Sequence, residues 1–175
     1  KDTHFDKNYN VYLVETNSGI QAVFKKISLN EYIVNNILKE NTNTSLVPIC
    51  YELVQSDNDY WLLSEYIEGN DLSILNHSYI TNFSQSLAEI SNTFFLNKYL
   101  LENLNPTFDE QLQNKYNLLN KLEKNSNIYN AYSIYIKRVI NMPLTLAHDD
   151  LLPINVLYNE NQLKIIDWEH GRVSS

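Results

Sequence analysis

Residues 146–169 read LAHDDLLPINVLYNENQLKIIDWE, and this stretch decides the interpretation of the chain. Two apolar runs, LTLA just before His148 and KII just before Asp167, end abruptly in acidic residues. A strand end is usually closed by Gly, Asn or a single turn-forming Asp. Here His148, Asp149 and Asp150 follow the first run and Asp167 follows the second. This grouping indicates a functional site that is assembled from two strand ends.

The spacing His148-x-Asp150-x4-Asn155, followed by Asp167 after the next strand, is typical of Mg²⁺-dependent phosphoryl transfer. A hydroxyl acceptor needs a carboxylate within hydrogen-bond reach to orient it and take its proton. Nucleotide phosphates need Mg²⁺, which prefers carboxylate and amide oxygens as ligands. We therefore predict Asp150 as the catalytic base and Asn155 and Asp167 as metal ligands. For the octet alone, an Asp-rich turn around a hydrogen-bonded His is the alternative interpretation.

The composition is that of a soluble globular protein. The chain has 175 residues, of which 43% are hydrophobic and 19% charged, and a formal net charge of −8. It contains no long apolar run and no cluster of basic residues, so we expect no membrane and no nucleic acid among its partners. A single cysteine, Cys50, and an opening segment without a signal sequence predict a reducing, cytoplasmic location. The acidic balance would suit a cationic substrate, although an ordinary acidic protein has the same balance.

Alternating apolar residues predict a β-rich first part of the chain. A helix is expected over about 29–40, because Ser28 can cap it and apolar residues recur at helical spacing behind it. A turn containing Gly19 joins the first two of the predicted strands. These strands cover 10–15, 21–27, 47–54 and 60–66.

After Gly69 the apolar residues recur every three or four positions and predict three helices. One covers about 79–101, the second begins after Pro106, and the third covers about 128–139. Short extended pieces are expected over 144–147, 155–158 and 163–166. The predicted fold class is therefore α+β, with a junction near 65–69 between a β-rich part and a helical part. Clefts at such junctions are favoured ligand sites.

The segment from Leu146 to Gly171 resembles the catalytic segment of the aminoglycoside phosphotransferase/choline kinase family, protein-kinase-like enzymes that phosphorylate hydroxyls of small molecules. The family pattern is roughly HxDLxxxNVL followed by an apolar residue and IDWE, and HDDLLPINVL and IIDWE are similar to it. Weaker similarity at 22–26 (AVFKK) and 61–72 (WLLSEYIEGNDL) extends the resemblance over most of the chain. It implies a bilobal protein-kinase-like fold, with a small antiparallel sheet and linker over 1–67 and a helical lobe over 68–175.

The resemblance also implies roles for residues outside the opening stretch. Lys25 would hold the α- and β-phosphates of a nucleotide, and Glu31 would hold Lys25 by an ion pair. His148 would organise the catalytic loop rather than act as the base. Backbone groups of the linker would meet the nucleotide base, and these belong to Ser64, Glu65, Tyr66 and Ile67.

Three alternatives stay open from the sequence alone. Lys25 and Lys26 lie on opposite faces of one predicted strand, so alternation does not decide which of them contacts phosphate. Glu31 is also the third residue after Ser28, and it could simply complete a capping box. Asp149 stands where the family commonly has Gly or Asn, so either of the two adjacent carboxylates could act.

The function implied by the resemblance is transfer of the γ-phosphate of ATP or GTP, with Mg²⁺, to a hydroxyl of a small cationic molecule. An aminoglycoside or a choline-like amino alcohol would fit, and the 13 Tyr and 2 Trp could supply a cation–π cage, although such aromatics more often pack in a core. A protein kinase is disfavoured because no Gly-rich loop is present. A non-catalytic nucleotide-binding protein, or a fragment of an enzyme, is the alternative. Few residues follow Glu169, so we expect a truncated C-terminal lobe and self-association through the surface left uncovered.

Overall fold

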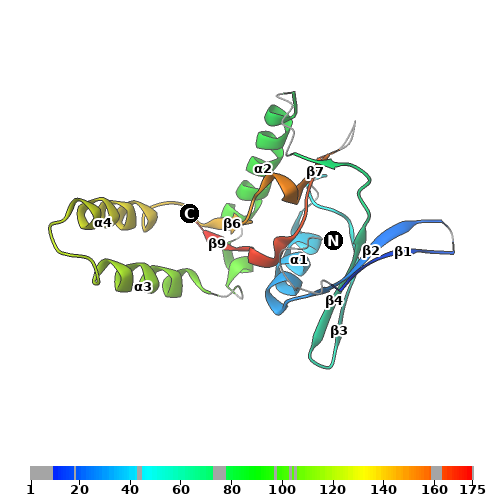
Figure 1. The fold of residues 1–175 in the computed structure, drawn as a ribbon, viewed down its shortest axis with the longest axis horizontal. Coiled ribbons are helices and arrows are strands. Elements are labelled where there is room, and N and C mark those ends of the chain that lie inside the picture. The colour runs from blue at the N-terminus through cyan, green and yellow to red at the C-terminus, as the bar shows by residue number, and fades with distance from the viewer. Residues whose placement is uncertain are drawn as a thin grey trace, which may run out of the picture.

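The computed structural model describes residues 10–17, 19–42, 45–72, 78–96, 98–102, 104, 106–158 and 163–174. These residues form an α+β fold with antiparallel sheets and four α-helices (Figure 1). Within them, no helix combines the length and the apolar character that crossing a bilayer would require.

A four-stranded antiparallel sheet forms the first part of the fold. Its strands are β1 (Val11–Glu15), β2 (Gln21–Ile27), β3 (Cys50–Ser56) and β4 (Asp59–Glu65), in the order β1-β2-β4-β3. The β1–β2 hairpin lies where alternation predicted it, and Gly19 in its turn has φ +82°, which glycine adopts readily. The strand predicted over 47–54 is shifted, because Pro48 cannot donate a ladder hydrogen bond and pairing starts at Cys50.

Helix α1 (Leu29–Asn41) connects β2 to β3 and supplies one side of the hydrophobic core. Ser28 is its N-cap, and the Ser28 hydroxyl accepts a hydrogen bond from the Glu31 N–H at 3.1 Å. Val34 and Leu38 of α1 are fully buried against residues from the later part of the chain, including Phe94. The core therefore joins α1 to α2 (Ser78–Leu96) and to the segments that follow it.

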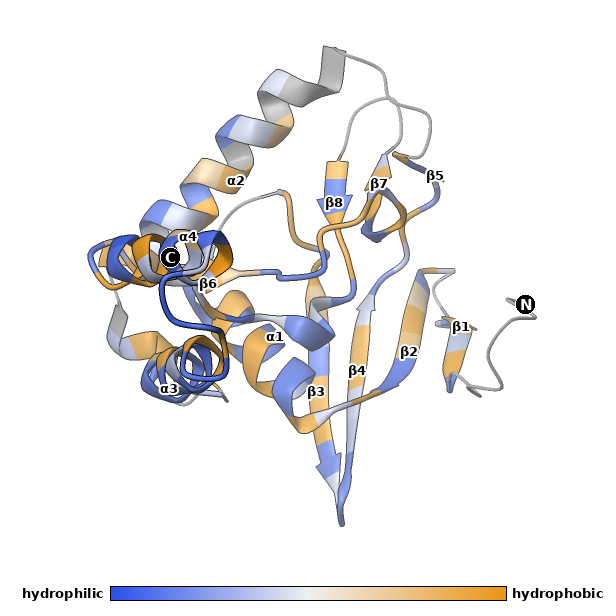
Figure 2. Ribbon diagram, turned by 60° about the vertical axis from the view of Figure 1, so that its left-hand side comes forward, coloured by the Kyte–Doolittle hydropathy of each residue, from blue (hydrophilic) through white to orange (hydrophobic). Residues whose placement is uncertain are grey.

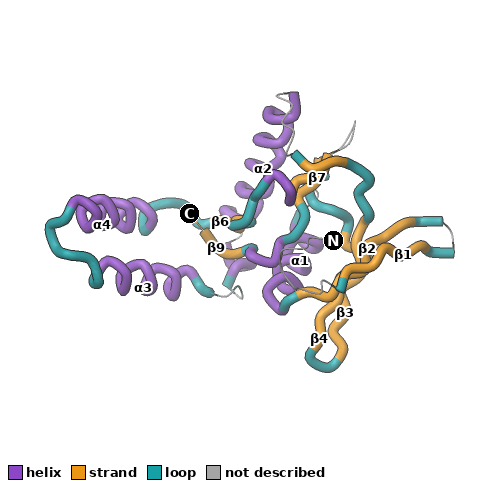
Figure 3. The backbone as a smooth tube through the Cα atoms, viewed as in Figure 1, coloured by secondary structure: helices purple, strands orange, loops and turns teal. Residues whose placement is uncertain are grey.

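The helices after α2 depart in part from the sequence prediction. The helix predicted over 79–101 ends at Leu96, and a short 3₁₀ turn (Lys98–Leu101) follows it. Helix α3 (Phe108–Leu119) begins with a capping box formed by Thr107 and Glu110. Together with α4 (Asn127–Val139) it forms a helical hairpin that projects from the rest of the fold (Figure 3). Both helices carry hydrophobic residues, shown orange in Figure 2.

Three short strand pairs complete the fold and position the loop that begins at His148. β7 (Val156–Tyr158) and β8 (Leu163–Ile165) form the predicted hairpin, and β6 (Thr145–Ala147) leads into His148. Two strands were not predicted: β5 (Asn70–Asp71) pairs with β7, and β9 (Arg172–Ser174) pairs with β6. The β6–β9 pairing brings the two acidic strand ends of the opening stretch to the same region of the molecule.

Candidate functional site

A cavity of about 660 Å³ is lined by the four-stranded sheet on one side and by the β7–β8 hairpin and the residues after it on the other. Val23 and Leu62 supply apolar surface from the sheet, and Leu157 and Ile165 supply it from the hairpin. Every predicted site residue except His148 and Asp150 lines this cavity. Those that do are Lys25, Glu31, Ser64, Glu65, Tyr66, Ile67, Asn155 and Asp167.

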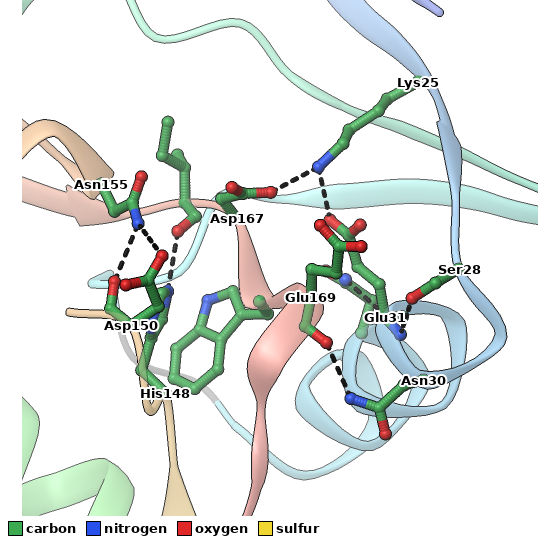
Figure 4. A network of polar contacts seen from close by, with 12 residues as sticks. Lys25, Ser28, Asn30, Glu31, His148, Asp150, Asn155, Asp167 and Glu169 are labelled. Carbon is green, nitrogen blue, oxygen red and sulfur yellow. Dashed lines mark hydrogen bonds and ion pairs between the residues drawn. The ribbon is translucent and has the colours of Figure 1, made fainter. Parts of the chain in front are cut away.

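Lys25 on β2 joins two carboxylates that are far apart in the sequence. Its Nζ lies 2.9 Å from Glu31 Oε1 and 2.5 Å from Asp167 Oδ1 (Figure 4). Burial alone would lower the pKa of the Lys25 ammonium, but the Glu31 and Asp167 carboxylates together raise it above its ordinary value. Lys25 is therefore a fixed positive charge in the cavity wall.

Lys26 and Glu31 have partners that bear on two of the open alternatives. Lys26, which also lines the cavity, lies 2.7 Å from Asp59 in a pair whose side chains are 38% and 48% exposed, whereas Lys25 bonds both Glu31 and Asp167. Glu31 caps α1 only through its backbone, because its carboxylate bonds Lys25. Burial raises the pKa of Glu31 above its ordinary value, and the Lys25 charge counters this only in part. Glu31 thus combines the capping position with the ion pair.

His148 connects the loop after β6 to the residue that precedes Asp167. The imidazole is 4% exposed, and its Nε2 lies 2.8 Å from the carbonyl oxygen of Ile166. A carbonyl oxygen can only accept, so Nε2 carries the proton and Nδ1 is the unprotonated nitrogen. Burial lowers the pKa of His148, which keeps the ring neutral near pH 7. The ring thus links the loop after β6 to the backbone next to Asp167.

Asn155 makes hydrogen bonds both to Asp150 and to the backbone of Ile166, which precedes Asp167. Its amide nitrogen donates to the Asp150 carbonyl oxygen at 2.8 Å and approaches the Asp150 carboxylate at 3.4 Å. Its backbone carbonyl oxygen accepts from the Ile166 N–H at 2.9 Å. The side-chain amide oxygen of Asn155 takes no part in these bonds and points away from Asp150 (Figure 4). Asn155 can therefore orient Asp150 with one end of its amide and offer an oxygen ligand with the other.

Asp149 and Asp150 differ in their partners. Asp149 has a left-handed backbone (φ +63°), and its Oδ2 lies 2.6 Å from a guanidinium nitrogen of Arg172 on β9. Asp150 instead contacts Asn155. Of the two adjacent carboxylates, Asp149 is held by an ion pair and Asp150 is the one associated with a residue of the cavity.

The residues present suit Mg²⁺ held partly by a nucleotide rather than by a closed protein cage. In the described part of the chain, no three His, Cys, Asp or Glu side chains gather as a metal site. Asn155 and Asp167 nevertheless line one cavity and offer an amide and a carboxylate oxygen. Mg²⁺ commonly takes one or two such protein ligands and completes its shell with phosphates and water.

Two further polar residues of this region escaped the sequence analysis. Lys164 on β8 is 5% exposed, and its Nζ lies 3.1 Å from Glu65 Oε2 and 3.2 Å from the Val47 carbonyl oxygen. Lys164 therefore joins the linker, residues 64–67, to the β7–β8 hairpin. In the sequence, its position between Leu163 and Ile165 in a predicted buried strand is the signal that could have revealed it. Asn30 on α1 donates to the carbonyl oxygens of Glu169 and Gly171. Nothing in its sequence context marks it.

Comparison of the sequence with protein-family models and with curated proteins found no match.

Proposed function

We propose that the protein is a Mg²⁺-dependent phosphotransferase with a two-lobed, protein-kinase-like arrangement. It binds ATP or GTP and transfers the γ-phosphate to a hydroxyl of a small cationic molecule, such as an aminoglycoside or a choline-like amino alcohol. The observation that supports this best is the position of Lys25 between Glu31 and Asp167 in a cavity that Asn155 also lines. A fixed cation beside two oxygen ligands matches what a nucleotide triphosphate with Mg²⁺ requires.

The nucleotide phosphates would occupy the polar end of the cavity. Lys25 would donate to the α- and β-phosphates, and Glu31 would hold the Lys25 ammonium in place. Asp167 and Asn155 would hold Mg²⁺, which supplies neutralisation of the phosphate charge that builds up during transfer. In this arrangement the Asp167 carboxylate would exchange part of its contact with Lys25 for contact with the metal.

The nucleotide base would lie against the linker after β4. The Glu65 N–H already donates to the Ile49 carbonyl oxygen at 2.8 Å, and the Glu65 carboxylate accepts from the Ile49 N–H and from Lys164. Glu65 is therefore a structural member of the linker. The backbone groups of Tyr66 and Ile67, which line the same cavity, are then the ones that would meet the base.

Asp150 would take the proton of the acceptor hydroxyl. As the acceptor oxygen forms its bond to the γ-phosphorus, the bond from phosphorus to the bridging oxygen breaks and the nucleoside diphosphate leaves. The hydroxyl proton passes to the Asp150 carboxylate, which Asn155 orients through its amide nitrogen. His148 stays neutral and takes no proton in this step.

Calorimetric titration with ATP and with GTP, each with and without Mg²⁺, tests the proposal. We expect wild-type binding that depends on Mg²⁺, and we expect Asp167→Ala to abolish that dependence because it removes the carboxylate ligand. Asn155→Ala should weaken binding less, since water can replace an amide oxygen. Asp59→Ala is the matched control, because Asp59 also pairs with a lysine but lies outside the cavity wall. Undiminished Mg²⁺–nucleotide affinity in Asp167→Ala would overturn the assignment.

Product mass measured against a panel of aminoglycosides and amino alcohols identifies the acceptor. A mass increase by one phosphoryl group in any of them, lost in Asp150→Asn, is the expected result. Nucleotide binding with no transfer to any acceptor would instead favour a non-catalytic nucleotide-binding protein.

A further inference from the structure

Asp167 has a backbone conformation that its surroundings must impose. Its φ of 63° and ψ of 60° lie in the left-handed region, which non-glycine residues adopt at a cost. Such a residue persists where the flanking structure over-determines it. On the N-terminal side, His148 holds the Ile166 carbonyl oxygen and Leu46 accepts from the Ile165 N–H at 2.7 Å. The backbone of Asp167 is held on both sides only if the residues that follow it are held as well.

On the C-terminal side, Asn30 holds the backbone of the 3₁₀ turn Trp168–His170 and the residue after it. Its Nδ2 donates to the carbonyl oxygens of Glu169 and Gly171, each at 2.9 Å (Figure 4 shows the first). The opposite amide orientation would set oxygen against two carbonyl oxygens, so the two acceptors fix the amide. Asn30 Oδ1 is buried and has no partner among the described residues. The two donated bonds are therefore the interactions by which this side chain contributes.

Gly171 brings the same turn into direct contact with α1. A Cβ at this position would lie 3.0 Å from both Cγ atoms of Val34, which is fully buried. The Gly171 φ of −56° and ψ of 130° are open to any residue. The absence of a side chain thus serves the close approach of the turn to α1 and not an unusual backbone conformation.

We propose that Asn30 is a positioning residue for Asp167, and that Asn30 and Gly171 make α1 and the turn 168–171 a single unit. Helix α1 also carries Glu31, and Lys25 bridges Glu31 to Asp167. The same helix therefore sets the lysine that would hold phosphate and the carboxylate that would hold Mg²⁺. The part of this inference that concerns the metal rests on the proposed function.

Asn30→Asp tests the inference with almost no change in size. An ionised carboxylate cannot donate to two carbonyl oxygens, so the turn should separate from α1. We expect faster amide hydrogen exchange at 166–171 in the protein without ligand, and about a 10- to 100-fold loss of Mg²⁺–nucleotide affinity, the usual size for a partner of a metal ligand. Asn36→Asp is the control, because Asn36 lies on the same helix and its partly exposed side chain donates to Glu40 instead of the turn.

A second pair of variants tests the contact itself. Gly171→Ala should raise exchange at 166–171 and weaken Mg²⁺–nucleotide binding, because the new Cβ meets Val34. The double variant Val34→Ala/Gly171→Ala removes the two Cγ atoms and should restore both properties toward those of Val34→Ala alone. The 3.1 Å approach of the same Cβ to the Trp168 carbonyl oxygen is common to the single and the double variant, so the rescue reports on Val34.

The outcomes separate this inference from the proposed function. Wild-type protein without Mg²⁺-dependent nucleotide binding would overturn the proposed function and the metal role of Asn30 with it. Wild-type protein that binds, together with unchanged exchange and affinity in Asn30→Asp or no rescue of Gly171→Ala, would overturn the inference alone.

Discussion

The adjacent carboxylates Asp149 and Asp150 differ in what each of them touches, and under the proposed function only Asp150 is the base. Asp150→Asn keeps the size of the side chain and its contact with Asn155 but cannot accept a proton. We predict a fall in turnover of about 10²–10⁴ with nearly unchanged nucleotide affinity. Steady-state kinetics and calorimetry on the same preparation measure the two quantities.

Asp149→Asn is the matched comparison for that prediction. Asn tolerates the left-handed backbone of this position and can still accept a hydrogen bond from Arg172. It should therefore cost much less turnover than Asp150→Asn. The reverse ranking would mean that Asp149 is the base.

His148 should make the stability of the fold depend on pH. Burial lowers its pKa below the ordinary value of 6.5, so the unfolded chain binds a proton there that the folded protein does not. The stabilisation is complete above this value and is lost as the pH falls below it toward the folded pKa. Urea unfolding at about pH 7.5 and about pH 5 should show this loss in wild-type protein and a smaller loss in His148→Gln.

Comparing the two proteins isolates His148 from other titrating groups. Glu31 acts in the opposite direction, since its raised pKa favours the folded state as the pH falls toward the ordinary carboxyl value. An identical dependence in His148→Gln would show that this ring is not the group responsible.

At the scale of elements, the linker and β8 are joined by the Lys164–Glu65 pair. Lys164→Met leaves a half-buried carboxylate without its partner. Breaking a buried pair costs about 3–5 kcal/mol of unfolding free energy, and we expect about 2–4 kcal/mol here because Glu65 stays partly in contact with solvent. Urea unfolding gives the value, and the double variant Lys164→Met/Glu65→Gln should recover part of it.

Lys26→Met is the exposed counterpart of that experiment. Its pair with Asp59 is open to solvent, so its loss should cost about 0–1 kcal/mol. Equal losses of unfolding free energy in Lys164→Met and Lys26→Met would contradict a stabilising buried ion pair between Lys164 and Glu65. Strict additivity of the effects of Lys164→Met and Glu65→Gln would contradict it too.

The helices and strands that could be predicted from the sequence are mainly those with long periodic patterns. The β1–β2 hairpin, α1 and α4 lie close to their expected positions because their apolar residues repeat over several turns or alternations. The β7–β8 hairpin also lies close to its expected position, although its strands have three residues each, because each strand is a short, mainly apolar run between polar segments. β5 and β9 have two and three residues and no such run, and their pairing is decided by neighbours distant in sequence. Side chains such as Asn30 and Lys164 escaped notice for the same reason. Their partners are backbone atoms and a carboxylate that only the fold brings near.

The candidate site was predictable where residue type and spacing carry chemistry. Asp167 came from the spacing of the acidic residues and Lys25 from motif resemblance, and the structure places them together without testing their role. The different partners of Lys25 and Lys26 could be seen only in the tertiary structure, because alternation along a strand shows only that the two side chains lie on opposite faces. The partner of Asp149 needed it too, since Arg172 belongs to a strand that the sequence did not predict.

At the scale of the molecule, the α3–α4 hairpin presents apolar side chains to solvent. Ile128 is 68% exposed and Ile134 is 54% exposed, both on α4. Exposed apolar patches promote association. We predict concentration-dependent self-association in sedimentation velocity experiments, which Ile128→Glu/Ile134→Glu should reduce without a change in nucleotide affinity. Ile20→Glu, at a comparably exposed isoleucine in the β1–β2 turn, should leave it unaltered. Equal association of all three proteins would exclude the α3–α4 hairpin as the contact.

The ion pair between Lys25 and Asp167 spans 142 positions of the chain, whereas that between Lys25 and Glu31 spans six. During synthesis the local pair can form as soon as α1 leaves the ribosome. At about 5–20 residues per second, the second carboxylate follows on the order of ten seconds later. Once β4 has also been made, the cavity-facing side of the sheet, with Val23 and Leu62, has no hairpin to cover it until residues 156–165 follow. The nascent N-terminal sheet thus passes through a stage in which this apolar surface is open to other chains.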